Sequence, residues 1–152
     1  MIRKNSLFLY GVQTQEGVFH SRSWNVSLPV NFLQLLLEEL DNLKLSKIRF
    51  CIHPLPSDIT QITYLAFKKP YEDAVHKHPR HNEIVIPLLG ESLHRTFRDD
   101  GSLVKETLMT GDDPTPISTE IGKWHSIKLL SGYFAMIEIG SGPFMPGSTI
   151  YK

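Results

Sequence analysis

His76-Lys77-His78-Pro79-Arg80-His81-Asn82-Glu83 brings three of the chain's seven histidines and one carboxylate together. Residues two apart on an extended strand point to the same face, so the imidazoles of His76 and His78 can converge on one ion. The chain can bend after Pro79, and Glu83 then opens an apolar strand, where a lone carboxylate needs a partner such as a metal ion. This segment therefore predicts a metal site.

A further ligand is expected about forty residues on, in Ile121-Gly122-Lys123-Trp124-His125. Gly122 makes a turn and His125 starts a strand, which in an antiparallel barrel can face the first pair of histidines. Three imidazoles and one carboxylate suit one divalent transition metal, and Fe, Mn, Ni, Zn, Co and Cu all remain open. With such an ion the site carries a charge of about +1, which favours an anionic or chelating small-molecule ligand.

The rest of the chain is dominated by short strand-like runs separated by turn residues. One helix is expected at about 30–43, with Asn31 as its cap. Many short strands with a single helix indicate an all-β sandwich or closed barrel. The expected strands are 6–12 and 17–22 as an opening hairpin, then 47–53, 60–67, 83–89, 92–98, 103–109, 117–121, 125–130 and 133–139.

Two turns and the domain plan follow from the same reading. Asp99-Asp100-Gly101 and Leu130-Ser131-Gly132 are expected to be tight turns, because glycine tolerates positive φ. Residues 140–147 are expected to form a coil over the barrel. We expect one domain over 1–152, with strands and the helix in about 1–45 and a metal-binding barrel in 46–152.

Composition limits the function classes. Sixteen basic residues balance sixteen acidic ones among 152, so no global field favours nucleic acid or an anionic membrane. No run approaches the roughly 18 apolar residues of a membrane helix, and the stretch after the N-terminal charges is too short for a signal peptide. The single cysteine, Cys51, excludes an internal disulfide and a Cys-based zinc site. A cytoplasmic location is the expectation.

The metal spacing His-x-His-x4-Glu-x6-Gly, ending at Gly90, resembles the first cupin motif, and Gly122-x-x-His125 resembles the core of the second. Glu120 stands where that family usually has Pro, and Leu129 where it has Asn. The chain more narrowly resembles the WbuC-type cupin-fold metalloproteins, with departures at Ile62 and Val75. The matching stretches, within roughly 47–146, are Arg49-Phe50-Cys51-Ile52-His53, His76-Lys77-His78-Pro79, Phe97-Arg98-Asp99-Asp100-Gly101, Ile121-Gly122-Lys123-Trp124-His125 and Glu138-x4-Gly142-Pro143-Phe144.

This resemblance implies a cupin (jelly-roll) antiparallel β-barrel with one N-terminal helix, and a homodimer. The group includes members from O-antigen gene clusters, which implies a carbohydrate or sugar-nucleotide connection.

Other polar residues are candidates for the pocket. His53, His94 and Tyr64 could act as proton donors or acceptors, and the alternative for each is a buried structural side chain. Arg49 could contact an anionic ligand or make a surface ion pair, and Trp124 could line the pocket or the core. His81 could replace a ligand but is expected to turn to solvent. Cys51 is expected to be an inert core thiol, and no neighbouring residues suggest a role for His20.

The leading hypothesis for function is a metal-dependent enzyme that acts on a small anionic or carbohydrate-related metabolite. Isomerisation, decarboxylation and oxygenation are all compatible with the site. The alternatives are a non-catalytic metal- or ligand-binding accessory cupin, and a structural dimer with a vestigial site. A nucleophilic hydrolase is not expected, because the chain has no Gly-x-Ser-x-Gly motif.

Overall fold

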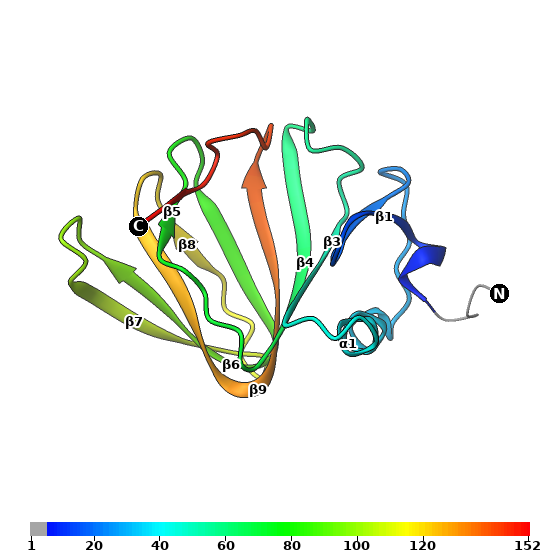
Figure 1. Ribbon diagram of the computed structural model, residues 1–152, viewed down its shortest axis with the longest axis horizontal. Coiled ribbons are helices and arrows are strands. Elements are labelled where there is room, and N and C mark those ends of the chain that lie inside the picture. Colours follow the sequence, from blue (N-terminus) through cyan, green and yellow to red (C-terminus); the bar gives the residue numbers. More distant parts are fainter. Residues whose placement is uncertain (1–5) are drawn as a thin grey trace.

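The computed structural model describes residues 6–152, which form one helix, one 3₁₀ turn and ten strands (Figure 1). The elements in chain order are η1 (Leu7–Leu9), β1 (Gly11–Gln15), β2 (Val18–Ser21), α1 (Phe32–Asn42), β3 (Lys47–Cys51), β4 (Thr60–Lys68), β5 (His76–Lys77), β6 (Glu83–Phe97), β7 (Leu103–Thr110), β8 (Ile117–Thr119), β9 (Trp124–Ser141) and β10 (Ile150–Tyr151).

Two long strands, β6 and β9, form the frame of the barrel. They pair antiparallel over their whole length, from Glu83 opposite Gly140 to Phe97 opposite Trp124. The first half of β6 pairs with β8, and the second half of β9 pairs with β4, which in turn pairs with β3. Together these strands form a first leaf. The second half of β6 pairs with β7, and the first half of β9 pairs with β5. These strands form a second leaf, with β10 at its edge. The two leaves enclose the barrel interior.

The expected interruptions of these two strands are wrong. We expected breaks between 89 and 92 and a turn at 130–132, but both strands continue through these positions. Gly90 has a φ of +72°, and the register shifts on both sides of it. Such irregularities bend a strand while its pairing continues, so the chain passes from one leaf to the other without a loop.

The leaf that contains β3 and β4 is buried on both faces. Alternate residues of β4 point in opposite directions: Leu65 and Phe67 belong to the barrel core, whereas Ala66 belongs to a second core beneath α1. The helix buries Phe32, Leu35, Leu36 and Leu40 in that second core. The helix therefore covers the outer face of the leaf, as Figure 1 shows, and leaves the inner face to the barrel.

Several expectations for the N-terminal part need correction. The helix is present, but the side chain of Asn31 makes no capping hydrogen bond. The expected strand 6–12 is a 3₁₀ turn followed by β1, which begins at Gly11. The pairing of β2 with β3 is parallel, so the sheet is mixed and not wholly antiparallel. A helix between the two strands allows this, because parallel neighbours need a crossover connection.

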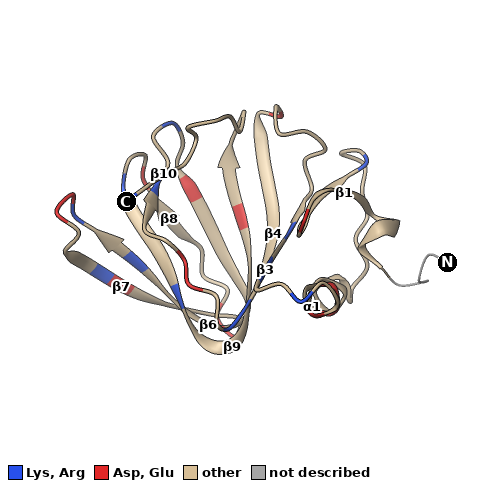
Figure 2. Cartoon of the chain, viewed as in Figure 1, with Lys and Arg blue, Asp and Glu red and all other residues tan. Residues whose placement is uncertain are grey.

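The Asp99-Asp100-Gly101 turn is confirmed, and the expected C-terminal coil begins two residues later than expected, because β9 continues to Ser141. Gly101 has a φ of +88° between β6 and β7. After β9 the chain runs as a coil to β10, which pairs with β5. Acidic and basic residues are scattered over the strands without a continuous run of one sign (Figure 2). Within residues 6–152, no helix is both long and apolar enough to cross a membrane.

Candidate metal centre

The structure brings the four expected metal ligands together. His76 lies on β5 opposite His125 on β9, His78 follows β5, and Glu83 begins β6. One ligand atom of each side chain lies within 4.8 Å of those of the other three. His78, Glu83 and His125 are buried, and His76 is partly buried. Segments that are separate in the sequence thus meet at one end of the barrel interior.

Backbone carbonyls orient all three imidazoles. The Nδ1 atoms of His76, His78 and His125 lie 2.8, 3.2 and 2.9 Å from the carbonyl oxygens of Ala74, Ser148 and Lys123, respectively. If each Nδ1–H donates to its carbonyl, each Nε2 is left with a lone pair. A hydrogen bond at the second ring nitrogen is the usual support of a metal-bound histidine. The C-terminal coil takes part in this support through Ser148.

The remaining atoms face one another. The two carboxylate oxygens of Glu83 lie 2.9 Å from Nε2 of His78 and 3.4 Å from Nε2 of His125. The His125 Nε2 atom is buried and makes no hydrogen bond, which is costly for a polar atom unless a partner occupies the space. Three imidazole nitrogens and a carboxylate that converge in a buried space fit a divalent transition metal.

The charge states of Glu83 and His76 suit such an ion, whereas His78 and His125 would lose a shared tendency to be protonated when it binds. Burial opposes ionisation of Glu83, but its contacts with His125 and His78 outweigh burial and lower its pKa, so the carboxylate is charged. Burial and the neighbouring His125 lower the pKa of His76, which is therefore neutral near pH 7. Burial also opposes protonation of His78 and His125, yet the Glu83 carboxylate raises the pKa of both.

His94 and His81 lie next to this group. The ring of His94 is 5.9 Å from that of His125, and its Nε2 atom lies 3.0 Å from the Thr119 hydroxyl. Burial and the charge of His125 lower the pKa of His94 to about 4, so the ring is neutral near pH 7. His81 stacks on His78 at 4.5 Å but is not one of the four converging residues.

Arg49 shares a charged part of the barrel interior with two residues that the sequence reasoning did not select. Lys47 and Arg49 are two apart on β3 and so point to the same face. The positive charges of both side chains lower the pKa of Glu138 on β9. Burial and the charge of Glu83 raise the pKa of Glu138 to about 7, against the opposing effect of Lys47 and Arg49. In the sequence, the two-residue spacing of Lys47 and Arg49 on one expected strand was the signal that could have pointed to this charged group.

A chain of hydrogen bonds leads from this region to the ligands. Lys47 Nζ donates to the Tyr71 hydroxyl at 3.3 Å, which donates to Asp73 at 2.9 Å. The other Asp73 oxygen accepts from the backbone N–H of Ile127 and lies 3.9 Å from Nδ1 of His76. The positive side chain of Lys47 is thereby fixed beside the candidate centre.

Three other candidates lie elsewhere. Tyr64 packs against Phe32 at 5.3 Å, on the helix side of its leaf. Trp124 donates to Asp99 at 3.0 Å, and the ammonium groups of Lys77 and Lys152 lie over its ring at 4.4 and 5.2 Å. His53 contacts His20 and the backbone of Ile62. Among residues 6–152, no hydrogen bond, ion pair or ring contact joins His53 to the four ligands.

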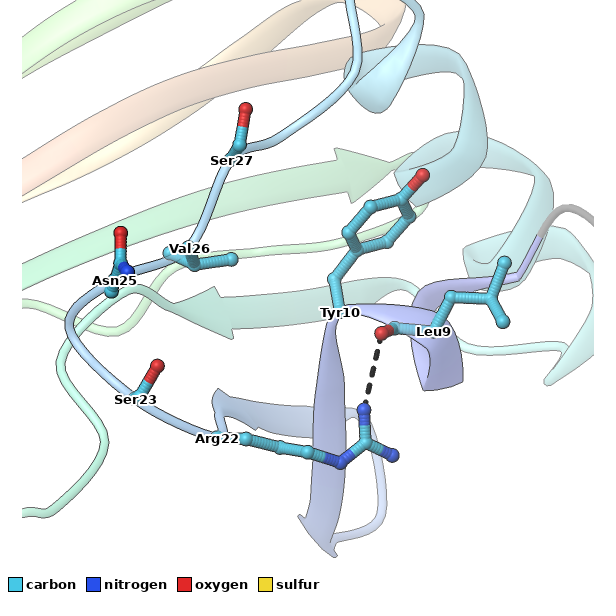
Figure 3. A pocket seen from close by; sticks show the side chains of 7 residues that line it. All are labelled: Leu9, Tyr10, Arg22, Ser23, Asn25, Val26 and Ser27. Carbon is cyan, nitrogen blue, oxygen red and sulfur yellow. Dashed lines mark hydrogen bonds between the residues drawn. The ribbon is translucent and has the colours of Figure 1, made fainter.

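A surface hollow of about 260 Å³ lies near the N-terminal hairpin (Figure 3). Its lining includes Arg22, whose guanidinium donates to the carbonyl oxygens of Leu9 and Phe8 at 3.1 and 2.9 Å. The Arg22 guanidinium is therefore already hydrogen-bonded to the backbone, and none of the four metal ligands lines the hollow. None of the expected site residues lines this hollow.

A bent two-leaf barrel of this kind defines the cupin class, also called the double-stranded β-helix, and comparison with known proteins supports this fold. No protein-family model matches the chain, and no curated protein matches it. Solved structures do match. The capsular polysaccharide assembling protein CapF from Staphylococcus aureus is 19% identical, with a TM-score of 0.59 over 69% of this chain and 31% of CapF.

Two smaller proteins also match. A conserved protein with a double-stranded β-helix domain from Klebsiella pneumoniae is 14% identical, with a TM-score of 0.54 over 70% of this chain and 79% of that protein. KdgF from Halomonas sp. is 14% identical, with a TM-score of 0.51 over 63% of this chain and 78% of KdgF. The chain therefore has the cupin fold, and it spans less than a third of the length of CapF.

Proposed function

We propose that this chain is a metal-dependent enzyme that acts on a small anionic metabolite. The observation that carries the proposal is the convergence of three imidazoles, each held by a backbone carbonyl, on the buried Glu83 carboxylate, where Nε2 of His125 makes no hydrogen bond. His76, His78, Glu83 and His125 would hold the ion. Bound there, a divalent metal would supply Lewis-acid polarisation of an oxygen ligand, or redox chemistry if it is iron.

The charges of the barrel interior support an anionic substrate. Lys47 and Arg49 place two cations on the inner face of β3, and Lys47 is fixed by Tyr71. A substrate carboxylate or phosphate can replace water around these side chains. His94, neutral and beside His125, and Glu138 are the groups available to hold or transfer a proton during the reaction.

The comparisons suggest a carbohydrate connection. CapF is a capsular polysaccharide assembling protein, and the resemblance to WbuC-type proteins points to O-antigen clusters. We therefore propose a carbohydrate-related metabolite, converted by isomerisation, decarboxylation or oxygenation. A homodimer and a cytoplasmic location complete the proposal.

Metal analysis of protein purified without added metal and without a histidine tag tests the site. We expect His125→Ala to lose about one transition-metal equivalent per chain. His81→Ala is the matched control, because its imidazole stacks on a ligand without belonging to the group, and it should keep the metal. The proposal fails if His125→Ala binds as much metal as the wild type, even after reconstitution.

A second experiment separates an enzyme from a binding module. The protein is incubated with an extract of small anionic metabolites, and mass spectrometry follows substrate loss and product gain. We expect His94→Gln to keep the metal and to lose turnover at least tenfold, within the usual range for a proton-transfer group. Depletion without any product, by metal-loaded wild type, would instead indicate a binding protein.

A further inference from the structure

A second cluster of metal-binding side chains lies where β2 meets β3. His20 on β2 is paired with Cys51 on β3, and His53 follows two residues later. All three side chains are buried, with 8%, 5% and 3% of their surface exposed, respectively. The crossover through α1 creates this cluster, because it places β2 parallel to β3 and so brings His20 beside a segment thirty residues away.

The donor atoms of this cluster converge. One ligand atom of each side chain lies within 4.8 Å of those of the other two. The Nδ1 atom of His20 lies 3.1 Å from the carbonyl oxygen of His53, and if it donates there, its Nε2 is free. The Ile62 N–H donates to Nδ1 of His53 at 3.0 Å, and the Ile62 carbonyl oxygen lies 3.1 Å from the same atom. Metal binding at Nε2 of His53 therefore requires the other tautomer, in which Nδ1 gives up the bond from the Ile62 N–H and donates to the Ile62 carbonyl.

The sulfur completes the set. Cys51 is the single cysteine of the chain, and its Sγ atom accepts a long hydrogen bond of 3.7 Å from the Thr63 hydroxyl. A thiolate with two imidazoles is a donor set that zinc prefers, and zinc bonds of about 2.0–2.3 Å require the three donors to move slightly closer.

From this juxtaposition we propose that His20, Cys51 and His53 form a second metal site, which binds Zn(II) with a water or small anion at the fourth position. Binding converts the Cys51 thiol to a zinc-bound thiolate and releases its proton to solvent. This site does not depend on the proposed function, because it shares no residue with the first site. A site with one sulfur and two imidazoles needs only one cysteine, so it is compatible with the single cysteine of the chain.

Cobalt(II) provides a probe that distinguishes the two sites. The full-length, tag-free protein is stripped with a chelator and titrated with Co(II), which replaces Zn(II) in such sites. The first site contains no sulfur, so only the second can give thiolate-to-cobalt charge transfer in the near-ultraviolet. We expect this band in wild type and in His125→Ala, and its displacement by added Zn(II).

Variants of the cluster complete the test. Cys51→Ser should abolish the band and reduce bound Zn(II) by about one equivalent per chain. His20→Ala and His53→Ala should weaken binding at this site alone, while Thr63→Val, which removes a neighbour that is not a ligand, should keep the band. Circular dichroism establishes that each variant is folded. A folded wild type without a thiolate band, or a band that persists in Cys51→Ser, would overturn the proposal.

Discussion

At the scale of single residues, the barrel interior contains ionisable groups whose surroundings set their charge. Glu83 is ionised because two histidines outweigh its burial, whereas Glu138 lacks such contacts and its pKa rises to about 7. Two carboxylates in one interior thus differ in protonation. Such a difference is typical of sites that need one ligand and one proton carrier.

The pH dependence of stability should reveal Glu138. Its folded pKa of about 7 exceeds its ordinary value of 4.5, so the folded state holds a proton that the unfolded state releases. This contribution is fully present below about pH 4.5 and is lost as the pH rises through about 7. Glu138→Gln should therefore raise the free energy of unfolding, relative to wild type, more at pH 8 than at pH 5.

Urea denaturation at both pH values measures this difference. Glu120→Gln is the matched control, because Glu120 is exposed and its substitution should have little effect at either pH. An equal effect of Glu138→Gln at pH 5 and pH 8 would show that Glu138 does not titrate in this range.

At the scale of elements, the fold depends on how β6 and β9 bend between the leaves. Gly90 has positive φ, and a Cβ atom at this position would lie 2.1 Å from the carbonyl oxygen of Tyr133. Gly122, just before β9, also has positive φ, but a Cβ atom there would meet no atom within 4 Å. The two glycines therefore separate the cost of backbone conformation from the cost of a clash.

We expect Gly90→Ala to destabilise the protein much more than Gly122→Ala. The left-handed conformation costs an alanine about 1–2 kcal/mol at either position. At Gly90 the clash adds to this cost, because the β6 and β9 backbones must move apart at the bend. Urea denaturation of both variants measures the difference, and similar values would show that the bend can relax.

At the scale of the whole molecule, the proposed ion would join the two leaves. Glu83 begins the first-leaf half of β6, whereas His76 and His125 belong to the second leaf. A ligand that binds the folded state alone stabilises it by mass action. The metal should therefore act as a link between leaves that are otherwise held by β6, β9 and the barrel core.

Removal of the metal should lower the melting temperature. A ligand at a hundred times its Kd contributes about 2.7 kcal/mol, and each kcal/mol corresponds to about 2–4 °C in a chain of this size. We expect a decrease of roughly 5–10 °C with a chelator, by differential scanning calorimetry. His125→Ala should show a clearly smaller decrease, and an unchanged wild-type melting temperature would contradict a structural role for the ion.

Much of the fold was predictable because it depends on local patterns. The alternation of apolar residues located most of the long strands but not the two-residue strands β5 and β10, and helical leucine spacing located α1 within about two residues. The expected breaks near Gly90 and Ser131 were wrong, because glycine and serine also permit a bend inside a continuous strand. Local propensity does not distinguish a bend from a turn when the partner strand is unknown.

The sequence by itself determined the chemistry of the four converging ligands, because His76, His78, Glu83 and His125 carry their donor atoms wherever the chain places them. The tertiary structure decided which other residues join them. It placed His94 beside His125, put Tyr64 under the helix and paired His53 with His20. These placements depend on strand register and on the parallel pairing of β2 with β3, which arise from the packing of distant segments and leave no periodic signal in the chain.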